Sequence, residues 1–193
     1  MTVDDERILL ERVAAKDRRA FERLYHIYYP RLFGYILKLT RRIDLVEEVL
    51  NDVMLAVWAG ASRFAGRSRP SSWIFGIAHH TALKALRRRS RYVEEPEEAA
   101  GEPVADEEPE SLLVRREQRD LLGQALARLP LEQRAVVELT YFHGFSYPEI
   151  ADILACPANT VKTRMFHARR RLREILPQLG IGAASGGGEG DRP

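Results

Sequence analysis

The stretch 145–174 constrains the fold of this chain most, because it contains the boundaries of two helices that are separated by a tight turn. Ser146 and Glu149 have the spacing of a capping box, which predicts that a short helix begins there. The tripeptide Ala-Cys-Pro ends this helix, and Asn159 is expected to cap a longer, basic helix that follows it. Two helices joined in this way form a helix-turn-helix.

The second helix of this motif has an apolar face and a basic face. Val161, Met165 and Ala168 recur at spacings of four and three, so we expect them to face the core. Such a helix fits the major groove of DNA, where Lys and Arg read guanine and Phe contacts the thymine methyl group. The side chains expected to face DNA are Lys162, Thr163, Arg164, Phe166, His167 and Arg170. The alternative is a solvated face on a core helix, but the capped helix in front favours DNA binding.

Charge is distributed very unevenly along the sequence. The net charge is +2, but the stretch from Glu94 to Glu110 holds nine acidic residues and no Lys or Arg, so the remainder carries +11. A body this basic attracts phosphate at long range. The acidic stretch also contains three prolines and few apolar residues, which predicts a flexible linker over 93–111. The Gly-rich end, 179–193, is expected to be disordered.

Composition indicates a soluble cytoplasmic protein. No apolar run in the 193 residues is long enough to span a membrane, and the acidic start of the chain does not have the pattern of a secretory signal. The single cysteine, Cys156, excludes an internal disulfide framework and fits a reducing compartment.

The N-terminal part is expected to be helical over 5–40, with a break or kink at Pro30, and again from Asp44, where Glu47 has capping-box spacing. One side of this second helix is apolar, and the other is an acidic face that consists of Glu47, Glu48, Asn51 and Asp52. Paired carboxylates suggest a metal or acid–base site, but no histidine lies nearby. A solvated face or a docking surface for a basic partner is favoured.

A loop over 59–72 interleaves basic, aromatic and small polar side chains. An aromatic ring can stack on an unpaired base while cations hold the backbone, so this loop suits single-stranded DNA. Its candidate residues are Arg63, Phe64, Arg67, Ser68, Arg69 and Ser71, whereas Trp58 and Trp73 are expected in the core. The helix that begins at Pro70 carries His79 and His80, which point about 100° apart, unsuited to sharing a metal, and are expected on a polar face near DNA.

Two further helices are expected over 112–129 and from Pro130 to Gly144. The predicted fold is therefore all-α, with two small helical domains over 1–92 and 112–178. The sequence contains no metal-ligand cluster, activated nucleophile or Gly-rich phosphate loop, so we expect no cofactor, no metal and no enzymatic activity.

With both basic domains and the acidic linker in view, the chain resembles a bacterial RNA polymerase sigma factor of the compact extracytoplasmic-function (ECF) type. The later match is LPLEQRAVVELTYFHGFSYPEIADILACPANTVKTRMFHARRRLRE, which is similar to the fourth sigma domain. The earlier match is DLVEEVLNDVMLAVW with SRFAGRSRPSSWIFGIAHHTALKALRRRSR, which is similar to the second sigma domain. The family usually has Gly where this chain has Ala155.

The resemblance implies a role for each surface. The acidic face would dock on the β′ subunit of core RNA polymerase, whose β and β′ subunits are the expected partners. The loop would open the minus-10 promoter element, the helix-turn-helix would read the minus-35 element, and the linker would thread the RNA-exit path. An anti-sigma protein is a further expected partner. The alternative is a plain helix-turn-helix regulator, which would not need the acidic face or the Arg-rich loop.

Overall fold

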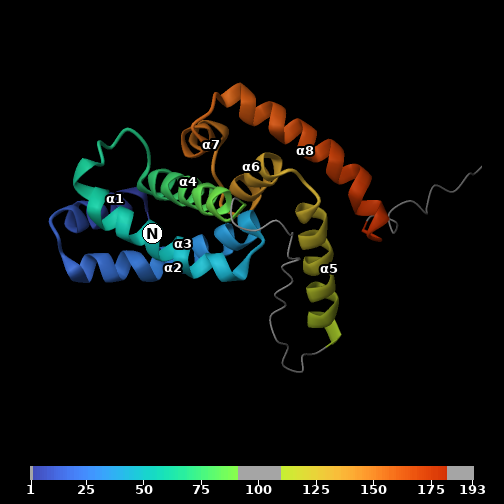
Figure 1. Cartoon of the computed structure of the whole chain (residues 1–193), viewed down its shortest axis with the longest axis horizontal. Coiled ribbons are helices and arrows are strands. Elements are labelled where there is room, and N and C mark those ends of the chain that lie inside the picture. The colour runs from blue at the N-terminus through green and yellow to red at the C-terminus, as the bar shows by residue number, and fades with distance from the viewer. Residues whose placement is uncertain (1, 91–109, 182–193) are drawn as a thin grey trace, which may run out of the picture.

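The structure is a computed structural model that describes residues 2–90 and 110–181. Within these ranges the chain forms helices and no strand, which confirms the all-α prediction. One group of helices lies together on the side of the N-terminus, and the other covers it from one side (Figure 1). The first group comprises α1 (Val3–Ala14), α2 (Arg18–Thr40), α3 (Ile43–Gly60), the 3-10 helix η1 (Ala61–Arg63) and α4 (Pro70–Ser90). The second comprises α5 (Glu110–Ala127), α6 (Leu131–Tyr141), α7 (Tyr147–Leu154) and α8 (Ala158–Gln178).

The first helical region is divided at a different place from the one predicted. It is interrupted at Lys16, which has a φ of 64°, and Asp17 then caps α2 by accepting hydrogen bonds from the next turn. Pro30 lies inside α2 and does not end it, so of the two predicted alternatives, a break or a kink, the break is excluded. Tyr28 and Leu32, on either side of this proline, are both buried, so packing holds the helix together across the missing donor.

The start of α3 also differs from the prediction. The helix begins at Ile43, and its N-cap, Arg42, makes no side-chain capping bond. Asp44 lies in the first turn, where it forms ion pairs with Arg42 and Arg89 at 3.1 and 3.0 Å. A carboxylate in this turn also interacts favourably with the helix dipole.

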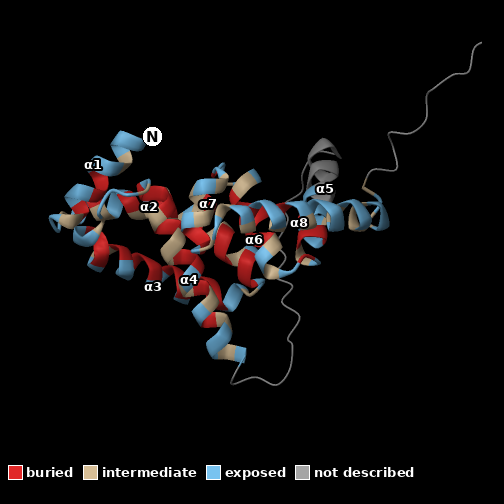
Figure 2. Ribbon diagram, turned by 90° about the horizontal axis from the view of Figure 1, so that it is seen from above, coloured by how far each residue is buried: buried red, intermediate tan, exposed pale blue. Residues whose placement is uncertain are grey.

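The cores of the two helical groups meet where α4 packs against α7. Figure 2 shows the buried faces of the helices turned toward one another. Phe75 on α4 is fully buried, and its ring lies 5.0 Å from that of Phe145 and 4.7 Å from that of His143. The two domains therefore share one continuous apolar core in this arrangement.

Of the predicted linker, 93–111, residues 93–109 lie outside the described part of the chain. Its last two residues belong to α5, which begins at Glu110. The predicted tail is described only for 179–181, which follow the end of α8.

Candidate nucleic-acid interface

The basic face of α8 is exposed, while its apolar face anchors the helix. Val161, Met165 and Ala168 are buried, as their spacing predicted. Between them, Phe166 is 64% exposed. Lys162, Thr163 and Arg170 are also exposed, and His167 is half-buried. A phenylalanine held out in solvent beside a lysine and a threonine has the composition of a base-reading surface.

The turn in front of α8 has an unusual backbone. The carboxylate of Glu149 accepts hydrogen bonds from the backbone N–H and the hydroxyl of Ser146, at 2.8 and 2.6 Å, so the predicted capping pair is present. Ala155 ends α7 in the left-handed region, with a φ of 49°. The predicted cap of α8 is wrong, because the helix begins at Ala158 with Pro157 as N-cap. Pro157 needs no N–H partner, which suits it to this position.

Arg164 differs from the other cations on α8. Its guanidinium forms an ion pair with Glu132 on α6 at 2.5 Å and lies 3.7 Å from the sulfur of Cys156. It therefore braces the helix-turn-helix against α6 in this arrangement.

The loop between η1 and α4 is the second candidate surface. Arg63 and Arg67 are exposed and Ser68 is half-buried. The ring of Phe64 is half-buried and lies 5.3 Å from that of Trp73, so the loop is anchored on an aromatic residue. Ser71 is buried at the start of α4.

The helix-turn-helix covers part of this loop. Arg69 forms an ion pair with Glu149 on α7 at 3.1 Å. The loop, α1 and α7 together line a hollow that also contains Arg7, Arg67 and Asp152. The loop expected to bind the minus-10 element thus lies against α7 of the helix-turn-helix while the domains are packed, whereas the basic face of α8 stays exposed.

The two adjacent histidines on α4 have different surroundings. His80 is exposed, but His79 is only 2% exposed, so the expectation that both lie on a polar face is wrong for His79. Its Nδ1 lies 2.9 Å from the hydroxyl of Tyr35. Burial lowers the pKa of His79 to about 4, and the nearby His80 and Arg164 act in the same direction.

The acidic face on α3 is exposed, as predicted, and part of it is engaged. Glu47 accepts a hydrogen bond of 2.6 Å from the hydroxyl of Tyr29, and Glu48 forms an ion pair with Arg88. Leu55, one turn beyond Asn51, is 65% exposed and extends this face with an apolar side chain. Its helical spacing from the acidic residues is a signal that the sequence analysis did not use. Over the described residues, no group of His, Cys, Asp or Glu has the arrangement of a metal site.

Several charged residues at the domain boundary were not singled out from the sequence. Glu138 on α6 is 1% exposed, and its carboxylate accepts a hydrogen bond of 3.1 Å from Lys38 on α2. Burial raises the pKa of Glu138, although Lys38 opposes this shift. The ammonium of Lys38 also lies 3.5 Å from the ring centre of Phe142. Only the approach of α2 to α6 makes these residues partners.

Comparison with known proteins identifies the family. The family described as Sigma-70 region 2 matches residues 24–92, and Sigma-70, region 4 matches 119–172. The ECF RNA polymerase sigma factor RpoE of Cereibacter sphaeroides is 31% identical over 83% of this chain and 88% of that protein. The ECF sigma factor SigK of Mycobacterium tuberculosis is 31% identical over 87% of this chain and 91% of that protein.

A solved structure supports the same conclusion. The sigma factor RpoE in complex with the anti-sigma factor NepR from Bartonella quintana is 27% identical, with a TM-score of 0.67, over 81% of this chain and 96% of that chain. The protein therefore belongs to the ECF RNA polymerase sigma factors. It directs promoter-specific initiation of transcription and is not itself a catalyst. None of the helices within the described ranges is long and apolar enough to cross a membrane.

Proposed function

We propose that three separate surfaces of this sigma factor divide the work of initiation. The exposed face of α8, with Lys162, Thr163 and Phe166, reads the minus-35 element. The loop with Arg63, Phe64 and Arg67 binds the opened minus-10 element, with His80 at its border. The acidic face on α3 docks on the β′ subunit of core polymerase. The domain containing α1–α4 and that containing α5–α8 thus correspond to sigma regions two and four.

The observation that carries this proposal best is the exposure of Phe166 on an otherwise well-anchored helix. Val161 and Met165 fix the rotation of α8, so Phe166 faces solvent, and its ring lies edge-on to that of the neighbouring His167 at 5.5 Å. An exposed aromatic ring is unfavourable in water and favourable against a thymine methyl group or a base edge.

The proposal also requires the two domains to separate. In the packed arrangement Arg69 is paired with Glu149, and His79 is buried. Arg69 belongs to the loop that would bind the minus-10 element, and its pairing with Glu149 on α7 holds it away from DNA while the domains are packed. Docking on polymerase in the cytoplasm would supply the free energy of separation. An anti-sigma protein, as bound by the RpoE of Bartonella quintana, would favour the inactive chain.

The test separates DNA reading from docking. Phe166→Ala should weaken binding to minus-35 duplex by about tenfold, or ~1–2 kcal/mol, and leave affinity for core polymerase unchanged. Asp52→Arg should show the reverse pattern, because it reverses charge on the acidic face. Glu22→Arg, an exposed reversal on α2, is the matched control and should change neither affinity. Loss of both affinities in either test variant would contradict the division of labour.

A further inference from the structure

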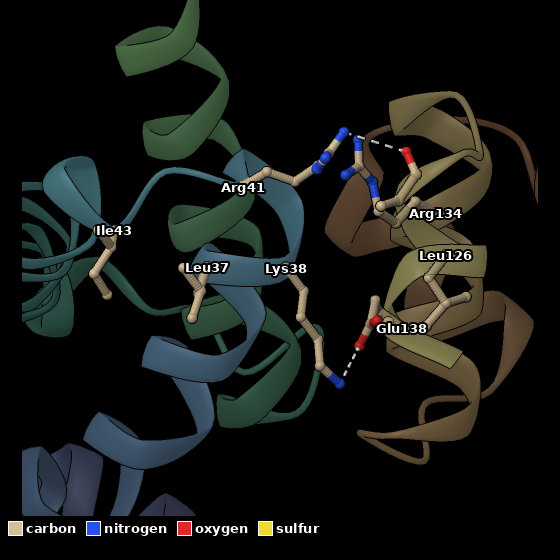
Figure 3. A pocket seen from close by; sticks show the side chains of 9 residues that line it. Leu37, Lys38, Arg41, Ile43, Leu126, Arg134 and Glu138 are labelled. Atoms are coloured by element: carbon tan, nitrogen blue, oxygen red, sulfur yellow. Dashed lines mark hydrogen bonds and ion pairs between the residues drawn. The ribbon is translucent and has the colours of Figure 1, made fainter. Parts of the chain in front are cut away.

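A cavity of about 280 Å³ lies between the two domains, where the end of α2 and the start of α3 face α5 and α6 (Figure 3). Both domains contribute to its wall, so it exists only while they are packed together. Its charged lining comprises Lys38, Arg41, Arg134 and Glu138, and its apolar lining includes Leu37 and Leu126.

Arg134 has hydrogen-bond donors that no group among the described residues accepts. The residue is only 8% exposed, and its Nε and Nη1 atoms are buried without a partner. Buried donors are normally satisfied, because their desolvation is otherwise uncompensated. A guanidinium has five such N–H groups in a fixed planar fork. Arg134 lines the cavity, so a small rotation of its guanidinium would let a ligand there satisfy these donors.

A second guanidinium lies beside the first. Arg41 extends from the end of α2 toward Arg134, and its Nη1 donates a hydrogen bond of 3.5 Å to the carbonyl oxygen of Ala127 (Figure 3). Burial lowers the pKa of Arg134, and the charge of Arg41 lowers it further. Two like charges at a partly desolvated boundary repel each other, and an anion between them would remove both the repulsion and the unmet donors.

Glu138 offsets part of the charge of Arg134, and its own carboxylate is only partly hydrogen-bonded. One of its carboxylate oxygens accepts from Lys38, and the other, Oε1, is buried without a hydrogen-bond partner. Arg134 and Glu138, four residues apart on α6, thus carry unpaired donors and an unpaired acceptor in the wall of the cavity. A small organic phosphate that carries a hydroxyl group matches both, because its oxyanion accepts from guanidinium groups and its hydroxyl donates to a carboxylate.

We propose that this cavity binds the phosphate group of a small molecule, held between Arg41 and Arg134. A planar fork suits a phosphate better than a lysine would, since it can donate two parallel hydrogen bonds. The ligand would contact one domain through Arg41 and the other through Arg134, so it binds only the packed arrangement. By linkage it stabilises that arrangement and lowers the affinity for polymerase.

The first test is calorimetric titration of the full chain at constant ionic strength. Inorganic phosphate and glycerol 3-phosphate are the probes, and glycerol and chloride are the controls. We expect saturable binding of at least one phosphate and none of either control. Tighter binding of glycerol 3-phosphate would identify an organic phosphate, and tighter binding of the inorganic ion would identify free phosphate. Absence of saturable binding for both would overturn the proposal.

Matched variants locate the site. Arg41→Gln should weaken phosphate binding at least tenfold, and Arg41 is exposed, so this change should not prevent folding. Arg134→Lys keeps the buried charge but loses the fork, and it should weaken binding by a similar factor. Arg128→Gln removes an exposed arginine that does not line the cavity and should leave affinity unchanged. If all three variants bind phosphate as tightly as the unaltered chain does, phosphate binds elsewhere and the proposed site is rejected.

Discussion

Ala155 shows how one residue sets the geometry of the turn in the helix-turn-helix. Its φ of 49° lies in the left-handed region, which costs a residue with a Cβ atom about 1–2 kcal/mol. Glycine avoids this cost but loses more entropy on folding. Ala155→Gly should therefore raise the free energy of unfolding by about 0.5–1 kcal/mol. Urea denaturation measures the change.

The control for this substitution lies in the same helix. Ala151 is in the interior of α7, where glycine has no conformational advantage. Ala151→Gly should lower the free energy of unfolding by about 0.5–1 kcal/mol. Destabilisation by both substitutions would show that the strain at Ala155 is not relieved by glycine.

His143 makes the contact between the domains sensitive to acid. Its ring lies 5.7 Å from that of Tyr35 and 4.7 Å from that of Phe75, and burial lowers its pKa to about 4, with Arg31 and Lys38 acting in the same direction. The unfolded or separated form, with an ordinary pKa near 6.5, binds the proton more readily. The contribution of His143 to packing is thus complete above about pH 6.5 and is lost as the pH falls toward 4.

The prediction is that the domains separate progressively between about pH 6.5 and 4, as measured by the radius of gyration in small-angle X-ray scattering. His79, whose pKa is also lowered to about 4, acts in the same sense. Glu138 acts in the opposite sense, because its raised pKa means that protonation favours the buried form. His143→Phe cannot be protonated and should keep the domains together to lower pH. An unchanged pH profile in this variant would remove His143 from the effect.

At the scale of elements, the contact between α7 and the Arg-rich loop has a direct consequence for DNA binding. Glu149→Gln removes the negative charge paired with Arg69 but keeps an oxygen that can accept from Ser146. We expect the full chain to bind single-stranded minus-10 DNA a few-fold more tightly, since even a surface ion pair contributes about 0.2–1 kcal/mol. Fluorescence anisotropy of labelled DNA measures the affinity.

Asp152→Asn is the matched control, because Asp152 is exposed and lines the same hollow but forms no ion pair with the loop as the structure describes it. It should change the affinity less than Glu149→Gln does. An equal increase in both variants would indicate a general loss of negative charge and would contradict a specific role for the contact between Arg69 and Glu149.

How far the elements could be predicted from the sequence depended on local signals. The capping pair of Ser146 and Glu149, and the spacing of Val161 and Met165, placed α7 and the buried face of α8 correctly because both are short-range effects. Asn159 was a wrong prediction for the start of α8, since the fixed backbone of Pro157 serves as the cap one residue before the helix. Which of several neighbouring residues becomes the N-cap of a helix depends on backbone angles, and amino-acid composition does not determine these angles.

The arrangement of the two domains could not be read from the sequence. Lys38 and Glu138 are 100 residues apart, and each alone is typical of a solvated helix surface. His79 was expected near solvent. The local sequence does not reveal its hydrogen-bond partner, Tyr35, because that residue lies 44 positions earlier in the chain. Contacts between helices that are distant in the sequence are set by the tertiary structure. The sequence therefore indicated which side chains are candidates for docking and for reading DNA, but it did not indicate which residues they contact.

For the whole molecule, the pair of Lys38 and Glu138 is a main polar contact between α2 and α6. Lys38→Met leaves a carboxylate buried without its partner, which should cost the packed arrangement about 1–3 kcal/mol. The double change Lys38→Met with Glu138→Leu removes both charges and should restore or increase packing. Small-angle X-ray scattering of the two variants tests this. If the domains stay packed in the single variant Lys38→Met, the ion pair does not hold them together.

The most direct measurement of the central claim is run-off transcription with purified core RNA polymerase on genomic fragments, with and without this protein. The account predicts discrete transcripts that require the protein and are lost with Phe166→Ala through weaker recognition of the minus-35 element. Specific binding of the protein to the same fragments without any dependent transcript would contradict a sigma factor that divides promoter recognition and polymerase docking between these surfaces.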